Sequence, residues 1–178
     1  MMQKMYNVRK AEPGDLAAVM LVERQSFDEN IVEEESVFAD RLAYAPDCNY
    51  VLVETATQSV CGYFTAELWA SVTSGANVFA LGHSVRECHQ PIGTVLYISS
   101  FALLPTIRGQ GLAENFFVVS IERIVAVFPQ VERFILLVHE DWHRAIRIYE
   151  KQGFIRTQVL ERFAWFGDRR AFIYEKSK

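Results

Sequence analysis

One segment of the sequence combines a strand pattern with small residues that suit the binding of a phosphate group. An apolar stretch from Thr94 to Leu104 ends at Pro105, and residues 108–113 then read Arg-Gly-Gln-Gly-Leu-Ala. Small residues let a ligand approach the backbone closely, and a helix that begins near Leu112 leaves N–H groups free at its start. This arrangement indicates a phosphate or pyrophosphate site. Because Gly-x-Gly alone is a weak motif, an ordinary strand-to-helix turn is the alternative interpretation.

Two common nucleotide motifs do not fit this segment. The chain has no Gly-Lys-Ser/Thr, which excludes a P-loop. The pattern Gly109-x-Gly111-x-x-Glu114 lacks the third small residue of the dinucleotide fingerprint. The segment also lies well along the chain rather than at the start of a βαβ unit.

A second segment places a tyrosine near the end of a predicted helix. Residues 145–154 read Ala-Ile-Arg-Ile-Tyr-Glu-Lys-Gln-Gly-Phe. The pattern predicts that Gly153 ends the helix in the left-handed conformation and that Phe154 returns to the core. Tyr149 lies on the same predicted helix face as Trp142 and Ile146. It is either a core residue with a polar end or a general acid.

Both segments resemble sequence blocks of the GNAT acetyltransferase superfamily. Residues 108–113 match its acetyl-CoA signature, Arg/Gln-x-x-Gly-x-Gly/Ala, and residues 145–154 resemble its Ala-x-x-x-Tyr-Glu-Lys-x-Gly-Phe block. The order of predicted elements, β-α-α-β-β-β-α-β-α-β-β, is similar over the whole chain. The resemblance implies an α/β (α+β) GNAT fold, with a mixed, mostly antiparallel sheet of about seven strands flanked by about four helices.

The resemblance also implies a cofactor site. In the superfamily the fourth and fifth strands splay apart, pantetheine lies in the gap along the fourth strand, and the pyrophosphate sits on the glycine-containing loop. The co-substrate is then acetyl-CoA, and no metal is needed. The cofactor-binding residues that this implies are Phe101, Ala102, Leu103, Arg108, Gly109, Gln110, Gly111, Leu112, Ala113 and Glu114.

The reaction that the resemblance implies is a direct transfer of the acetyl group in a ternary complex. A neutral primary amine attacks the thioester, and Tyr149 serves as general acid for the departing thiolate. A small amine is the expected acceptor. Acetylation of a protein N-terminus or lysine is one alternative, and a non-catalytic acyl-CoA-binding module is another.

The general base stays unassigned. The arylalkylamine N-acetyltransferases, one branch of the superfamily, carry His-x-His on the fourth strand, where this chain has Tyr97 and Ser99. Neither is a good base near neutral pH, since tyrosine has a reference pKa of about 10 and a serine hydroxyl is weaker still. Trp142 stands where many members have asparagine. Ordered water, Glu67 or a histidine from elsewhere would have to take the amine proton.

Residues 71–93 form the least patterned stretch, and they contain His83, Cys88 and His89. A connection of this length is usually functional or mobile. The spacing of the three residues matches no standard zinc motif, which predicts a surface loop. The acidic run from Glu33 to Glu35 is expected to be a solvated helix start, where the helix dipole favours negative charge.

Further candidates lie beside the predicted site. The tripeptide 139–141, His-Glu-Asp, follows a predicted strand and could attract a cationic amine or relay a proton. The alternative is a polar turn in which Asp141 caps the next helix. An apolar acceptor pocket or the core could hold the large aromatic residues Trp69, Trp142, Phe163 and Trp165.

The elements that must position these residues follow from hydrophobic periodicity and from the turn residues. Strands are predicted at 6–9, 49–54, 60–69, 94–104, 133–138, 154–165 and 170–175. Helices are predicted at 16–27, 33–44, 112–128 and 142–152. The last two strands are expected to form a hairpin around Gly167-Asp168.

The composition limits the class of protein. A chain of 178 residues predicts one domain, 1–178, and 51% hydrophobic with 22% charged residues is typical of a globular protein. A net charge of −4 and the lack of a basic block argue against nucleic-acid binding.

The longest apolar run, residues 16–22, is far shorter than the roughly 20 residues of a membrane span. Three cysteines without a framework spacing and a start without a signal-peptide pattern predict a cytoplasmic protein. Whether it forms a homodimer stays open.

Overall fold

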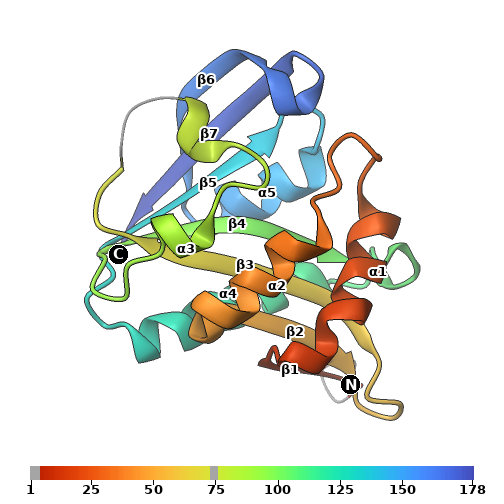
Figure 1. Ribbon diagram of the computed structural model, residues 1–178. Coiled ribbons are helices and arrows are strands. Elements are labelled where there is room, and N and C mark those ends of the chain that lie inside the picture. The colour runs from red at the N-terminus through yellow and green to blue at the C-terminus, as the bar shows by residue number, and fades with distance from the viewer. Residues whose placement is uncertain (1–4, 73–75) are drawn as a thin grey trace.

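The computed structural model, which describes residues 5–72 and 76–178, contains a seven-stranded sheet in the order β1-β2-β3-β4-β5-β7-β6 (Figure 1). Only β4 and β5 run parallel, and the other neighbours are antiparallel. The strands are β1 (Tyr6–Lys10), β2 (Asn49–Glu54), β3 (Val60–Trp69), β4 (Val95–Leu103), β5 (Arg133–His139), β6 (Ile155–Phe163) and β7 (Arg169–Ser177). The mixed, mostly antiparallel sheet expected from the sequence is confirmed.

Four longer helices and one short one are present in the part of the chain that the structure describes. They are α1 (Leu16–Ser26), α2 (Glu35–Tyr44), α3 (Val85–Cys88), α4 (Leu112–Val127) and α5 (His143–Lys151). Pro129 follows the end of α4, and Gly153 follows α5 with a φ of +84°, as predicted for a helix C-terminus. No described helix is long and apolar enough to cross a membrane.

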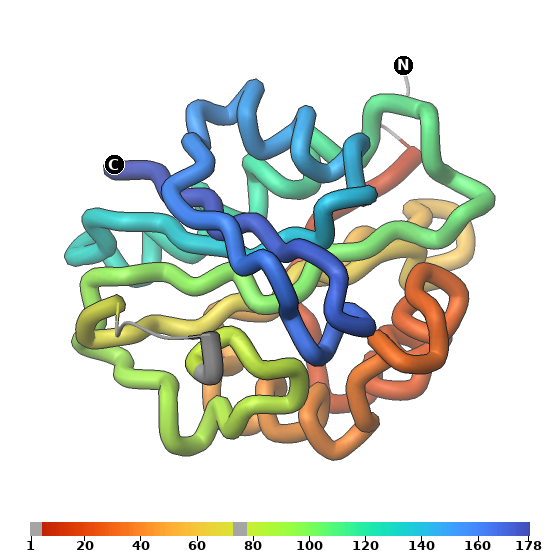
Figure 2. The backbone as a smooth tube through the Cα atoms, turned by 90° about the horizontal axis from the view of Figure 1, so that it is seen from above, coloured from red at the N-terminus to blue at the C-terminus, as the bar shows by residue number. Residues whose placement is uncertain are grey.

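The helices cover both faces of the sheet. Seen from above, α4 and α5 lie on one side, and α1 and α2 lie on the other together with residues 76–92 (Figure 2). Because both faces are covered, successive side chains of β3 pack against helices on opposite sides of the sheet. Phe64 packs against Phe117 of α4, and Tyr63 packs against Phe38 of α2, with ring centroids 5.8 and 5.3 Å apart respectively.

β4 and β5 separate part of the way along their length. Their parallel pairing runs only from Val95↔Arg133 to Ile98↔Leu136. Beyond that point β4 continues to Leu103, still paired with β3 but not with β5. The sheet therefore opens between these two strands.

The opening coincides with a β-bulge in β4. In the pairing with β3, Thr65 lies opposite Ser100 and Ala66 lies opposite Ile98, so Ser99 is an extra residue. Both serine side chains reach the same face of β3. The Ser99 hydroxyl lies 2.9 Å from that of Thr65, and the Ser100 hydroxyl lies 2.7 Å from that of Tyr63.

Candidate functional site

A cleft of about 750 Å³ opens at the place where β4 and β5 separate. Most of the residues predicted to bind the cofactor line it, and so does Tyr149. Gln110 does not line it and is exposed in the loop. The predicted residues on its wall are Phe101, Ala102, Leu103, Arg108, Gly109, Gly111, Leu112, Ala113 and Glu114. The structure thus brings together segments that are far apart in sequence.

The backbone of β4 offers hydrogen-bonding groups to the cleft. The N–H of Leu104 donates to the carbonyl of Cys61 on β3, at 2.8 Å. Since successive residues of a strand point their backbone groups to opposite sides, those of Phe101 and Leu103 point away from β3 and toward the cleft. The Leu103 carbonyl there accepts hydrogen bonds from Arg108 Nε at 2.9 Å and from the Ser26 hydroxyl at 3.3 Å.

The glycine-containing loop adopts a conformation that favours glycine. Gly109 and Gly111 have φ angles of +79° and +75°, and Gly111 is the N-cap of α4. A Cβ built on either glycine would meet no atom within 4 Å. There is thus room for a ligand beside the loop and in front of the free N–H groups at the start of α4.

Positive charge gathers at this end of the cleft. Arg108 donates from Nη2 to the Ser26 hydroxyl at 2.9 Å, and burial together with Arg144 lowers its pKa. Arg144 and Arg147 of α5 also line the cleft. These two arginines were missed in the sequence, although their positions beside Ala145 in the second block are a signal that could have found them.

Glu114 has a structural partner. Its carboxylate accepts hydrogen bonds from Lys151 at 2.7 Å and from Gln152 at 2.8 Å, which tie α4 to α5. The side chain therefore holds together two helices that flank the cleft.

Tyr149 is buried against aromatic rings but keeps its hydroxyl available. Its ring centroid lies 5.2 Å from that of Phe117 and 6.2 Å from that of Phe154. Its hydroxyl makes no hydrogen bond to any residue that the structure describes. Burial raises the pKa of this phenol, so it holds its proton firmly at neutral pH.

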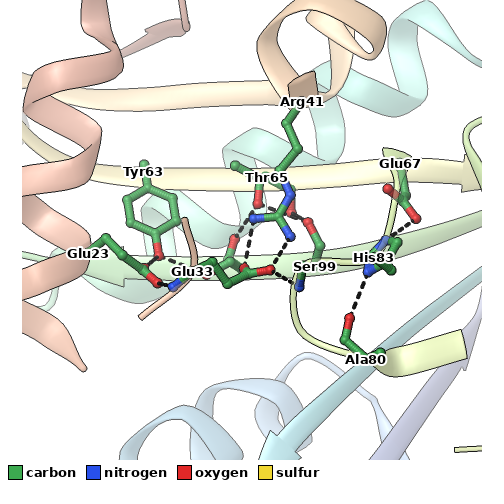
Figure 3. A network of polar contacts seen from close by, with 11 residues as sticks. Glu23, Glu33, Arg41, Tyr63, Thr65, Glu67, Ala80, His83 and Ser99 are labelled. Carbon is green, nitrogen blue, oxygen red and sulfur yellow. Dashed lines mark hydrogen bonds and ion pairs between the residues drawn. The ribbon is translucent and has the colours of Figure 1, made fainter. Parts of the chain in front are cut away.

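A buried acidic network forms the other end of the cleft, where Glu23 and Glu33 line the wall (Figure 3). Glu23 of α1 accepts hydrogen bonds from the hydroxyl of Tyr63 and, at 3.0 Å, from the backbone N–H of Glu33. Burial raises the pKa of Glu23, although both hydrogen bonds oppose the shift. The Tyr63 hydroxyl in turn contacts Ser100, so a chain of polar atoms leads from Glu23 to β4.

The expectation that Glu33 lies in a solvated helix start is wrong. Glu33 precedes α2 and is only 7% exposed. Arg41 reaches back from α2 and donates to both carboxylate oxygens, at 2.8 and 2.9 Å. The backbone N–H of Gly82 adds a third bond at 2.7 Å. These donors compensate for the burial of the carboxylate, which is why the chain can hold it inside.

The buried charges on this side do not balance. Among the described residues, three carboxylates, those of Glu23, Glu33 and Glu67, are buried there with two basic groups, the guanidinium of Arg41 and the imidazole of His83. A charge in a medium of low dielectric constant is costly unless an opposite charge lies nearby. This region of the molecule therefore favours a bound cation.

His83 does not lie in a surface loop, contrary to the expectation for residues 71–93. Its Nε2 lies 2.6 Å from Glu67 Oε1, and its side chain is 9% exposed. Burial alone would lower the pKa of His83, but the hydrogen bond to Glu67 and the charge of that carboxylate leave it raised. His89 is also engaged, since its Nδ1 accepts the N–H of Leu68 at 3.1 Å. Residues 73–75 of this stretch lie outside the described part of the chain.

Glu67 is not placed to act on an acceptor in the cleft. Its Oε1 accepts hydrogen bonds from Trp69 Nε1, at 2.5 Å, and it does not line the cleft. Tyr97 lines the cleft but stacks on Trp69, with ring centroids 4.3 Å apart, and burial raises its pKa. Tyr97 is therefore no better as a base than an ordinary tyrosine.

The tripeptide after β5 is held by its own contacts. His139 is buried, stacks on Trp142 with centroids 5.5 Å apart, and has a pKa lowered by burial. Arg169 and Arg170 hold the pKa of Glu140 at about 2. Asp141 does not cap α5, since Trp142 occupies the N-cap position and the Asp141 side chain bonds Arg169 instead.

The aromatic candidates divide between cleft and core. Trp142 lines the cleft and contacts Phe27 of the α1 C-terminus, with centroids 5.1 Å apart. Trp69 and Phe163 do not line the cleft but are buried in a core cluster directly behind its wall, and Trp165 packs against that cluster.

Comparison with solved structures shows the same fold at low sequence identity. The loading GNATL domain of CurA from Lyngbya majuscula is 14% identical with a TM-score of 0.80, and the alignment covers 97% of each chain. The GphF GNAT-like decarboxylase in complex with isobutyryl-CoA is 15% identical with a TM-score of 0.75, over 96% of this chain and 98% of that one. The ribosomal-protein-S18-alanine N-acetyltransferase from Escherichia coli is 16% identical with a TM-score of 0.70, over 97% and 94%.

A search of the curated proteins gives no match to this chain. The family model described as the Acetyltransferase (GNAT) family matches residues 16–154, which include both sequence blocks and the elements from α1 to α5. The chain belongs to the GNAT acetyltransferase family.

Proposed function

We propose that the protein is an acetyl-CoA-dependent N-acetyltransferase whose acceptor is a small primary amine. The observation that carries the proposal is a single cleft with two chemically different ends. One end has Arg108, left-handed glycines and the start of α4, and the other has the buried carboxylates of Glu23 and Glu33. Tyr149 lies on the wall of the same cleft.

The first end fits the phosphates and pantetheine of a coenzyme A thioester. Backbone N–H groups at the start of a helix of 16 residues favour an anion, and three arginines add positive charge. The backbone groups of Phe101 and the N–H of Leu103 can pair with the amides of pantetheine, since the Leu103 carbonyl is already bonded by Arg108 and Ser26. Bound acetyl-CoA would supply the activated acetyl group. Solved neighbours support this ligand class, since the structure of GphF is a complex with isobutyryl-CoA and that of the NatC complex is bound to Gag peptide and CoA.

The second end fits a cationic amine. A primary amine has a pKa near 10 in water, so it arrives with a proton that must be removed before the nitrogen can attack. Glu33 is held as an ion pair by Arg41, whereas Glu23 has a pKa raised by burial. A carboxylate with a raised pKa is the better proton acceptor. We assign Glu23 as the general base, with Tyr63 and Ser100 as its hydrogen-bonded link to β4.

Tyr149 completes the proton balance. In the reaction the acceptor nitrogen forms a bond to the acetyl carbon and loses a second proton, the carbon–sulfur bond breaks, and the thiolate takes a proton from Tyr149. The proton that leaves the nitrogen restores the phenol through solvent, so one proton is released overall when the amine arrives protonated. Tyr149 lies on the cleft wall with a phenol that stays protonated at neutral pH and has no hydrogen-bond acceptor among the described residues. These properties suit a general acid.

The acceptor end is partly closed, which favours a small molecule over a chain. Phe79 and Leu81 from the segment after β3 and Phe166 from the β6–β7 hairpin line the cleft. A peptide amino terminus is the second candidate acceptor, because the neighbours also include N-terminal acetyltransferases such as Arabidopsis thaliana Naa50 in complex with the bisubstrate analogue CoA-Ac-MVNAL. The odd number of cysteines and their lack of a framework spacing support the proposed cytoplasmic location.

Release of free CoA thiol from acetyl-CoA tests the proposal. The purified protein is assayed with a panel of small primary amines, with short peptides that have free N-termini, and without an acceptor. We expect turnover above the acceptor-free rate with at least one small amine. Turnover with peptides alone would establish the second candidate. Binding of acetyl-CoA without turnover on any acceptor would leave a binding module and refute the enzyme.

A further inference from the structure

A cluster of metal-binding side chains lies behind the acceptor end of the cleft. Glu67 of β3, His83 and Cys88 each place one donor atom within 4.8 Å of the other two. The Glu67 side chain is fully buried, His83 is nearly so, and Cys88 is half-buried. The three residues come from two segments, because His83 and Cys88 both belong to residues 76–92 and Glu67 belongs to the sheet.

The contacts of His83 require an additional positive charge. Its Nδ1 lies 3.1 Å from the carbonyl oxygen of Ala80, and its Nε2 lies 2.6 Å from a carboxylate oxygen of Glu67 (Figure 3). Both neighbours are acceptors, and a neutral imidazole carries a hydrogen on only one nitrogen. With Nδ1–H donating to the carbonyl, Nε2 presents a lone pair to a carboxylate. At 2.6 Å the space between Nε2 and the carboxylate oxygen holds a proton, and a metal ion would replace that proton with each donor atom about 2.0–2.2 Å from the ion.

A second observation favours a ligand larger than a proton. The other carboxylate oxygen of Glu67, Oε2, is buried and has no hydrogen-bond partner among the described residues. An orphaned buried oxygen of a carboxylate is costly, and one proton on His83 does not satisfy it. A cation bound by the carboxylate, the imidazole and the thiol would give the buried carboxylate oxygen a partner and would be coordinated by the other two groups.

We propose that Glu67, His83 and Cys88 bind a divalent transition-metal ion, with zinc the best match to the donor set. Zinc takes carboxylate oxygen, imidazole nitrogen and thiolate sulfur together in sites of four ligands, and a water molecule can supply the fourth. On binding, Cys88 releases its thiol proton to solvent, and His83 binds as the neutral ring. The bond from Nδ1–H to Ala80 and the bond from Trp69 to Glu67 orient two of the ligands, as outer partners do in metal sites.

The site has a structural consequence for the cleft. The metal joins β3 to the segment that contributes Phe79 and Leu81 to the cleft wall and the Gly82 N–H to Glu33. Metal binding fixes that segment against the sheet. The site does not depend on the proposed reaction, and its test needs no substrate.

Titration with cobalt and zinc tests the site on the full chain. The protein is treated with a chelator, exchanged into metal-free buffer and titrated with Co²⁺, which reports thiolate ligation by a sulfur-to-metal absorption band. We expect one equivalent to produce the band, one equivalent of Zn²⁺ to remove it, and the melting temperature to rise with Zn²⁺. A folded protein that gives no band and no stoichiometric zinc binding would leave the proton as the missing charge and overturn the site.

Matched variants assign the ligands. Cys88→Ser should abolish the cobalt band, and His83→Ala should weaken zinc binding by more than the roughly 10- to 100-fold typical of losing an outer partner. Cys61→Ser is the control, because Cys61 is also a free cysteine of this chain but lies outside the cluster. It should keep the band and the zinc affinity. A band that survives Cys88→Ser, or disappears in Cys61→Ser, contradicts the assignment.

Discussion

At the scale of single residues, Tyr149 is proposed to donate a proton and Glu23 to accept one, and burial shifts the pKa of both groups. Burial raises the pKa of each group. For the tyrosine this keeps the phenol protonated at neutral pH, and for the glutamate it increases proton affinity. Both shifts raise proton affinity, so Tyr149 starts in the protonated form that a general acid needs, and Glu23 binds a proton more strongly than an ordinary glutamate.

Tyr149→Phe tests the general acid. Removal of the hydroxyl should lower kcat by about 10²- to 10⁴-fold, while the KM for acetyl-CoA stays near the wild-type value. Because the hydroxyl bonds no described residue, the melting temperature should hardly change. Both quantities are measured on one preparation. A variant with wild-type kcat ends the assignment and leaves Tyr149 as a packing residue.

Glu23→Gln tests the general base through pH. Only the ionised carboxylate accepts the amine proton, so the wild-type kcat/KM should rise with pH through the raised pKa of Glu23 and then level off. Tyr63 and the Glu33 N–H donate to this carboxylate and Arg41 lies nearby, all of which oppose the upward shift that burial and Glu33 cause. The variant should lose about 10²-fold in kcat/KM at the plateau together with this rise. Ser100→Ala, which interrupts only the link to β4, should keep the rise. An unchanged profile in Glu23→Gln would exclude Glu23.

The residues of the two sequence blocks could be predicted, and those of the acidic network could not. The blocks are local in sequence, so their glycines and Tyr149 can be identified from a few neighbours. In the sequence Glu33 resembles its two acidic neighbours. What sets it apart is its burial and the hydrogen bonds that it accepts from Arg41 and from the backbone of Gly82. Partners brought together by tertiary folding leave no local signal.

At the scale of elements, the cleft depends on β4, the loop after it and the start of α4. The element ranges follow well from hydrophobic periodicity, and β4 and α4 each differ from prediction by a residue or so at their ends. The bulge at Ser99 was not predictable, because an apolar run from 94 to 104 reads the same with or without one extra residue. The short α3 was also missed, since four residues are too few for a periodic pattern.

Gly111→Val tests the loop as the phosphate site. A branched side chain at a φ of +75° blocks the approach of a phosphate to the backbone and also strains the loop. We expect the variant to lose the rise in melting temperature that acetyl-CoA causes in the wild type. Gly167→Val is the matched control, since its φ is +62° and it lies in the β6–β7 turn away from the loop. The control should lose intrinsic stability but keep the full shift with acetyl-CoA. A retained shift in Gly111→Val would place the phosphates elsewhere.

Leu81→Ala tests the segment between β3 and β4 as part of the acceptor wall. Leu81 lines the cleft and is only partly buried, so its truncation should cost less stability than that of a core residue. We expect a higher KM for the amine, by roughly the 10-fold or more that apolar contacts confer, and an unchanged KM for acetyl-CoA. Equal increases in both KM values would mean that the segment maintains the structure of the whole cleft and does not contact the acceptor specifically.

At the scale of the whole molecule, charge is distributed unevenly around a net value of −4. A chain with this net charge does not attract an anionic cofactor as a whole. The attraction must come from the local cluster of Arg108, Arg144 and Arg147 at one end of the cleft. The opposite end carries the excess of buried carboxylates. The arginine end of the cleft therefore favours the anionic acetyl donor, acetyl-CoA, and the carboxylate end favours a cationic amine acceptor.

Two measurements test the role of the arginine cluster: the stabilisation of the fold by acetyl-CoA and the dependence of its Kd on salt. Acetyl-CoA at about 100 times its Kd should stabilise the fold by roughly 2.7 kcal/mol, which thermal unfolding can measure. Because the arginines are partly exposed and the Debye length is about 8 Å at 0.15 M salt, the Kd should increase when salt is raised. Arg147→Gln should reduce that salt dependence. A Kd that does not respond to salt would mean that backbone contacts alone hold the phosphates.

The bulge in β4 has a consequence for how the binding space is encoded. Pairing of β4 with β5 ends at Ile98, directly before the extra residue Ser99. One more residue gives β4 about 3.3 Å of contour length that β3 does not match, and a bulge bends its strand and increases its twist. The surplus turns the second half of β4 away from β5. Room for a ligand thus follows from a difference in length between adjacent strands, which is a property of the backbone pairing rather than of one side chain.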